Sequence, residues 1–192
     1  YDATTTAAAA DQTLSGLQNS ETLTLSGSGT VTSADVGTSK TITVGSLALS
    51  DGTGTASNYT ITGGTHTLDV TQAVLSSSGS RTYDATTTAA AADQTLSGLQ
   101  NSETLTLSGS GTVTSADVGT SKTITVGSLA LSDGTGSASN YTITGGTHTL
   151  DVTQAVLSSS GSRTYDATTT AAAADQTLSG LQNSETLTLS GS

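Results

Sequence analysis

The chain has 192 residues, a formal net charge of −11, and no Cys, Pro, Met, Trp or Phe. Without Cys it can form no disulfide framework, no Cys-ligated zinc site and no thiol nucleophile. The negative charge is the wrong sign for binding nucleic acid or an anionic membrane surface. No apolar run approaches the roughly 20 residues of a membrane helix, so we expect no membrane insertion either.

The sequence repeats with a period of 82 residues. Copy one is 1–82, copy two is 83–164 and copy three is 165–192, and each opens with the same Tyr-Asp-Ala text. Copies one and two differ at a single place, where Thr55 is replaced by Ser137. A fixed period of this length indicates a tandem array of one structural unit.

Apolar and polar residues alternate along each copy, which predicts short strands with one face buried. Ala7 to Ala10 leave room for a single helical turn and no more, since Ala favours helix but the run is short. Gly63 and Gly64 predict a hairpin turn between two strands. In copy-one numbering, the predicted strands are 4–9, 13–17, 21–26, 30–33, 40–49, 58–62, 65–71 and 74–81, the last leading into the next copy.

Half of all residues are Ser, Thr or Gly, and many short strands with turn signals between them favour an all-β fold. We predict tandem small β-sandwich (Ig-like) domains in a linear array, with a β-solenoid or a β-grasp-like module as the alternatives. The strand pattern runs unbroken to Gln72 and starts afresh at Val74. We therefore expect residues 1–73 to be a repeat lacking its first strand, 74–155 a complete repeat and 156–192 a partial one.

Four segments resemble the YDG-type repeat of large bacterial surface adhesins, including filamentous-haemagglutinin-like ones. In order they are RTYDATTTA, SADVGTSKTITV, SDGTGTASNYTIT and TLDVTQAVL. The resemblance identifies Tyr83, Asp84, Asn140 and Tyr141 as family-motif residues, and it implies a β-rich module in an exported stalk. Ala85 stands where the family name has Gly, so we expect no left-handed turn there, because Ala carries a steric penalty that Gly avoids.

Other candidate sites are weak. Asp51 and Asp133 each begin a short Gly-containing loop that is loosely typical of calcium, but calcium usually takes several carboxylates and each Asp is alone locally. His66, the one His of its copy, is expected to be a surface or capping residue. The tyrosines are expected to be core residues or contacts between domains, with sugar stacking as the functional alternative.

With one His per copy and no Cys, nothing activates the abundant Ser and Thr hydroxyls, so we expect no enzyme and no cofactor. The leading hypothesis is a structural repeat region of an exported bacterial adhesin or matrix fibre, extracellular and at the cell surface. It would act as an extended stalk that contacts neighbouring repeats and other copies of the same chain. The alternative is an adhesive module that binds glycans multivalently.

Overall fold

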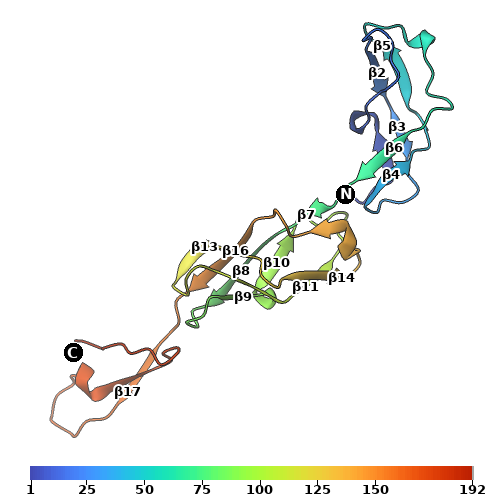
Figure 1. The fold of residues 1–192 in the computed structure, drawn as a ribbon. Coiled ribbons are helices and arrows are strands. Elements are labelled where there is room, and N and C mark those ends of the chain that lie inside the picture. The colour runs from blue at the N-terminus through green and yellow to red at the C-terminus, as the bar shows by residue number, and fades with distance from the viewer. Residues whose placement is uncertain (192) are drawn as a thin grey trace. The chain divides into compact units, whose positions relative to one another are not determined.

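The computed structural model describes residues 1–191, and within that range it contains strands and short 3₁₀ helices but no α-helix. The strands form several small sheets, with neither a closed barrel nor a solenoid among the described residues (Figure 1). The predicted all-β class and the single helical turn are thus confirmed. The 3₁₀ helices are η1 (Ala9–Asp11), η2 (Ala56–Asn58), η3 (Ala91–Asp93), η4 (Ala138–Asn140) and η5 (Ala173–Asp175).

The chain divides into two compact units that do not follow the sequence copies. Unit 1 combines copy one up to Leu75 with two segments of copy two, 98–106 and 131–145. Unit 2 holds 76–97, 107–130 and 146–192. Residues of consecutive copies therefore lie within the same compact unit.

Unit 1 contains four small two-stranded sheets. Its core is built from Ala7, Val31, Ile42 and Leu47, with Leu25 and Leu68 against them. The antiparallel pairs are β1 (Thr6–Ala8) with β3 (Ser28–Thr30), β2 (Leu23–Ser26) with β5 (Ala48–Asp51), and β4 (Gly37–Thr41) with β6 (Thr67–Val70). The fourth pair, β7 (Ala73–Val74) with β15 (Tyr141–Thr142), is parallel and joins two copies.

Unit 2 contains the largest sheet, four strands in the order β10, β8, β16, β13 (Figure 1). Strand β8 (Ser76–Thr82) lies between β10 (Gln94–Ser97), which is antiparallel to it, and β16 (His148–Thr153), which is parallel. Thus the last residues of copy one complete a sheet of copy two. The fourth strand of this sheet is β13 (Gly119–Thr123), and the other strands of unit 2 are β9 (Thr88–Ala90) paired with β12 (Ser110–Thr112), and β17 (Ser158–Gly161) paired with β18 (Gln176–Ser179). The division between the units falls within β11 (Leu105–Ser108) and within β14 (Ala130–Asp133).

The single strand predicted for 40–49 is wrong: two strands, β4 and β5, occupy this stretch with a turn between them. Gly45 has φ 57°, and a Cβ on it would lie 2.7 Å from the Ser28 carbonyl oxygen. The backbone reverses there because only Gly fits both the left-handed conformation and the close approach.

The predicted hairpin at Gly63–Gly64 is also wrong in its pairing. A turn is present, since the Gly64 N–H donates to the Ile61 carbonyl at 3.3 Å. However, β6 pairs with β4, and the counterpart of residues 59–60 in copy two, β15, pairs with β7. A local turn signal indicates where the chain bends, but the partners of the flanking segments are set by distant residues.

The left-handed turn that seemed unfavourable at Ala85 is present, with φ 59°, and recurs at Ala3 and Ala167. The side chain of Asp84 holds it: one carboxylate oxygen accepts from the Thr86 N–H and hydroxyl, both at 2.9 Å, and from the Arg81 guanidinium. Burial opposes ionisation of Asp84, but these hydrogen bonds outweigh it and lower its pKa. This local network therefore outweighs the steric penalty on Ala85.

We expect Ala85→Gly to stabilise the chain by about 1 kcal/mol, because glycine removes the left-handed penalty that alanine carries. The matched control is Ala89→Gly. Ala89 is a fully buried residue of β9, and it lies opposite Gly111 of β12. That change should instead destabilise the chain by about 1 kcal/mol. Chemical denaturation of both variants checks the pair, and equal destabilisation by both would contradict the steric penalty assigned to Ala85.

Candidate functional site

Within unit 1, the Glu103 carboxylate joins tyrosines from two copies. The Tyr1 hydroxyl donates to Oε1 of Glu103 at 2.7 Å, and the Tyr141 hydroxyl donates to Oε2 at 2.5 Å. The two tyrosine rings meet edge to face, with centroids 5.2 Å apart and an interplanar angle of 78°. Aromatic pairs favour this geometry because the ring edge is positive and the face negative. We call these three residues the tyrosine–carboxylate junction.

The junction keeps its tyrosines protonated. Burial, together with the hydrogen bond to Glu103, raises the pKa of Tyr1 to about 12. The same two causes raise the pKa of Tyr141, which is 2% exposed. A second anion beside Glu103 in a partly desolvated site is unfavourable, so each tyrosine acts as a hydrogen-bond donor.

Asn140 forms a second link beside the junction. Its side chain is 2% exposed; Oδ1 accepts from the Val36 N–H at 2.9 Å and Nδ2 donates to Oδ1 of Asp35 at 3.0 Å. The bond from Asn140 lowers the pKa of Asp35. Lys40 fixes the loop that presents Asp35 and Val36, since its Nζ donates to the carbonyls of Ser33 and Asp35. A residue of copy two is therefore satisfied by a preformed loop of copy one.

A third link involves the end of copy one. The Gln72 side-chain amide donates to the Ser139 carbonyl at 3.1 Å and to the Tyr141 carbonyl at 3.0 Å. The Leu75 N–H donates to the Thr142 carbonyl at 2.8 Å. Both contacts align the 72–75 segment along the Asn-Tyr motif of copy two.

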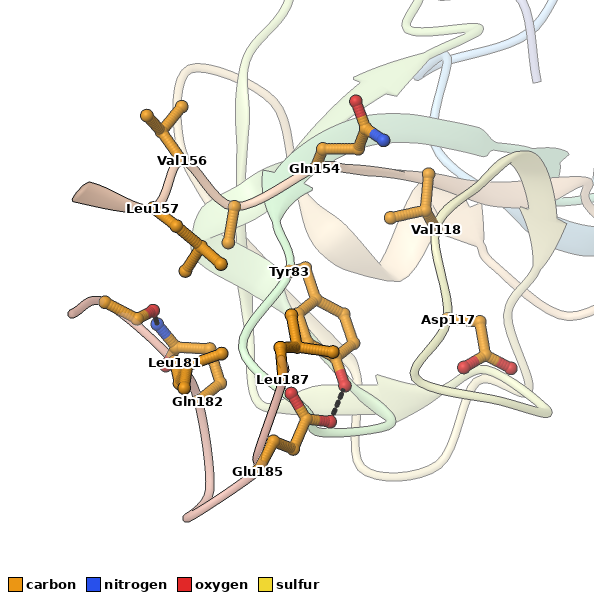
Figure 2. Close-up of a pocket in the computed structure, with 12 residues that line it drawn as sticks. Tyr83, Asp117, Val118, Gln154, Val156, Leu157, Leu181, Gln182, Glu185 and Leu187 are labelled. Carbon is orange, nitrogen blue, oxygen red and sulfur yellow. Dashed lines mark hydrogen bonds between the residues drawn. The ribbon is translucent and has the colours of Figure 1, made fainter. Parts of the chain in front are cut away.

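In unit 2, the Tyr83 hydroxyl donates to Oε1 of Glu185, as Tyr1 does to Glu103 (Figure 2). This bond is the main cause of a raised pKa for Tyr83. The Tyr83 N–H also donates to the Thr153 carbonyl, just as the Tyr1 amine contacts Thr71. Tyr83 lines a cavity of about 490 Å³, with Val118 and Leu187 among the other lining residues (Figure 2). The same contact pattern thus recurs one period later in the sequence.

The candidate calcium residues Asp51 and Asp133 cap their own loops. Oδ1 of Asp51 accepts from the Ala56 N–H at 2.6 Å, and Oδ1 of Asp133 accepts from the Ala138 N–H at 2.7 Å. Residues 1–191 contain no group of three or more His, Asp or Glu side chains positioned to hold a metal. The same residues include no helix long and apolar enough to cross a membrane.

The surface or capping role expected for His66 is wrong for its counterpart in copy two, His148. His148 is 4% exposed and lies on the same face of β16 as Leu150 and Val152. Its Nδ1 lies 3.0 Å from the hydroxyl of Ser77, which also bonds Gln94 at 2.9 Å. The polar ring tolerates burial because β8 brings this hydroxyl to it.

Of the motif residues predicted from the sequence, Tyr141 and Asn140 lie together at the junction, while Asp84 holds the turn at Ala85. Sequence reasoning missed Glu103, Asp35 and Gln72. One signal was available for Glu103, because it is the single Glu of its copy in a chain otherwise rich in Asp. No local pattern marks Asp35 or Gln72 as partners of residues more than 60 positions away.

We expect Tyr141→Phe to destabilise the chain by about 1–3 kcal/mol, because it removes a buried donor to Glu103 and an acceptor for the Gln100 N–H. The matched control is Tyr59→Phe, the same residue in copy one, which bonds Glu21 but is half-exposed. Denaturation should show a clearly smaller loss for this control. Equal losses of stability in the two variants would mean that the tyrosine–glutamate bond acts only within a copy and that the junction adds nothing to the stability of the chain.

The raised pKa of Tyr1 predicts a loss of stability at high pH. Its pKa of about 12 in the folded chain lies above the unfolded value of about 10. The folded state therefore holds the proton more tightly, so this contribution is complete below pH 10 and is lost between about pH 10 and 12. Tyrosinate absorbance and the NMR shift of Tyr1 check this, and Glu103→Gln should lower the pKa. Titration of Tyr1 near 10 in the intact chain would contradict the geometry.

Comparison with known proteins gives one family. The model of the YDG domain matches twice in tandem, over residues 1–68 and 65–149. No curated protein and no solved structure matches this chain. Since the two matches cover more than half of the chain, it belongs to the YDG domain family and carries two tandem YDG domains.

Proposed function

We propose that this chain is a structural repeat region of an exported bacterial adhesin or matrix fibre, and that its copies form an extended stalk at the cell surface. The observation that carries the proposal is the junction itself. The most buried polar and aromatic side chains of unit 1, Asn140 and Tyr141, both contact copy one: Asn140 accepts from the Val36 N–H, and the ring of Tyr141 packs against Tyr1. Because these residues link one repeat to the next, the array is suited to hold its repeats in a fixed order and to transmit force along its length.

In this proposal each copy is a small β-sandwich and contacts only its neighbours in the array. The length of such a repeat protein follows its number of copies. A net charge of −4 in each complete copy disfavours collapse of copies onto one another. Lack of Cys makes the array independent of the redox conditions outside the cell.

The glycan-binding alternative would need exposed aromatic rings. The rings of Tyr1 and Tyr141 are packed against each other, and Tyr141 is 2% exposed. Those rings are thus committed to the link between copies, which favours the stalk over a sugar-stacking site at these positions.

Small-angle scattering on arrays of two, three, four and six copies tests the stalk proposal. We expect the maximum dimension to grow by a constant increment for each added copy. The double variant Glu103→Ala with Asn140→Ala, introduced at each equivalent position, should broaden the distance distribution, because the links at the junction are lost. A maximum dimension that stays nearly constant as copies are added would contradict the proposal.

A further inference from the structure

The chain enters and leaves the four-stranded sheet of unit 2 through two neighbouring strands. Along the chain, β8 is the first strand of this sheet and β16 is the last, while β10 and β13 come between them. Within the sheet, however, β8 and β16 are adjacent and hydrogen-bonded to each other. A pull along the chain therefore acts directly on the bonds between these two strands.

Strands β8 and β16 run parallel over their whole overlap. Ser77 lies opposite His148, and the register continues without a break to Thr82 opposite Thr153. The chain enters β8 beside the first of these pairs and leaves β16 beside the last. Entry and exit therefore lie at opposite ends of the ladder that joins the two strands.

This arrangement decides how a pull on the chain loads the hydrogen bonds. Tension draws β8 toward its N-terminal end and β16 toward its C-terminal end, so the strands are pulled past each other along their length. The evenly spaced bonds of a parallel pair are then strained together. If the first and last strands were antiparallel, entry and exit would lie at the same end of the ladder, and its bonds would break one after another.

Further hydrogen bonds close the ladder at both of its ends. At the entry end, the Ser77 N–H donates to the Thr147 carbonyl at 3.0 Å. At the exit end, the Tyr83 N–H donates to the Thr153 carbonyl at 2.8 Å, and the Thr153 hydroxyl donates to the Arg81 carbonyl at 3.2 Å. Neither end is left unpaired, so separation of the strands has no frayed end from which to begin.

Strand β8 also carries a steric stop against sliding. Gly79 lies opposite Gln94 of β10, and a Cβ on Gly79 would lie 1.7 Å from the Asp93 carbonyl oxygen. The smallest slide that keeps every side chain on its own face of the sheet is two residues. Under tension, such a slide brings Arg81 to the place of Gly79. Because even a Cβ does not fit there, the Arg81 side chain blocks the movement.

We propose that β8 and β16 form a tension clamp, which resists forced unfolding because a pull along the chain loads their ladder in shear against the stop at Gly79. The chain has no Cys, so resistance to tension must come from such non-covalent contacts. Forced unfolding depends on the unfolding rate, and the clamp acts on that rate. The clamp is a property of one sheet and goes beyond the proposed function; only its use at a cell surface rests on the stalk proposal.

The first experiment pulls single full-length chains in two directions with optical tweezers. Introduced cysteines give unique attachment points, because the chain has none of its own. Val74→Cys with Gln154→Cys applies tension at opposite ends of the ladder, whereas Thr82→Cys with Gln154→Cys applies it at one end. All three positions are exposed, so the two variants keep the same contacts.

At equal loading rate, we expect the rupture force to be higher by about twofold or more in the first direction, because the ladder bonds must break together there and one by one in the second. Since the same sheet is opened in both cases, the difference reports the direction of loading. Equal rupture forces in the two directions would overturn the proposal.

The second experiment tests the steric stop with Arg81→Gly in both pulling variants. The matched control is Ser80→Gly, the exposed neighbour in the same strand. Loss of the Arg81 side chain also removes its bond to Asp84, which lowers stability whatever the direction of the pull. The informative quantity is therefore the ratio of the rupture forces in the two directions. We expect this ratio to fall for Arg81→Gly and to be kept by Ser80→Gly.

A ratio that neither change lowers, or that both lower equally, would contradict the stop at Gly79. The outcome for the clamp is separate from the outcome for the stalk. Equal forces in the two directions would refute the clamp but would leave the growth of an array with copy number as expected. An array whose maximum dimension does not grow would refute the stalk, while the directional resistance of the single sheet could still be measured.

Discussion

The pairing of β8 with β16 is the contact that joins the end of copy one to the sheet of copy two and buries one face of β16. Strand β8 precedes Tyr83, so it is encoded in the last residues of copy one, yet it lies inside the four-stranded sheet of copy two. Its hydroxyl at Ser77 allows His148 to be buried, and its parallel pairing accompanies the complete burial of Leu150. Consecutive copies are consequently linked by a ladder of main-chain hydrogen bonds as well as by the covalent chain.

Side chains also link copy one to copy two. Aromatic residues make up only 3% of the sequence, and the structure places Tyr1 and Tyr141 where copies one and two meet. A small module with few large apolar residues has little burial energy to spare. Glu103, Asn140 and the Asp35 loop add hydrogen bonds whose partners come from different copies, so formation of the link and completion of the fold occur together.

Period-two alternation was enough to predict the all-β class and most strand positions, because that pattern reports a local property of the chain. The partners of the strands were not predictable in this way. Asp35 and Asn140 are 105 residues apart, and nothing in either local sequence marks them as a pair. The prediction at Ala85 was wrong for a different reason. Alanine does carry a steric penalty in the left-handed conformation, but the hydrogen bonds of Asp84 outweigh it. The local sequence could not predict burial of His148, because the Ser77 hydroxyl that contacts its ring comes from β8.

Amide hydrogen exchange followed by NMR, with copy one and copy two labelled separately by segmental ligation, tests the central claim most directly. Separate labelling is necessary because the two copies give identical peptides around β6 and β16. The account predicts much slower exchange for the amides of Leu150 and Val152 than for those of Leu68 and Val70 in the monomeric chain, because β8 covers only the first pair. Equal protection of these identical residues would contradict the claim that the end of one copy completes the sheet of the next.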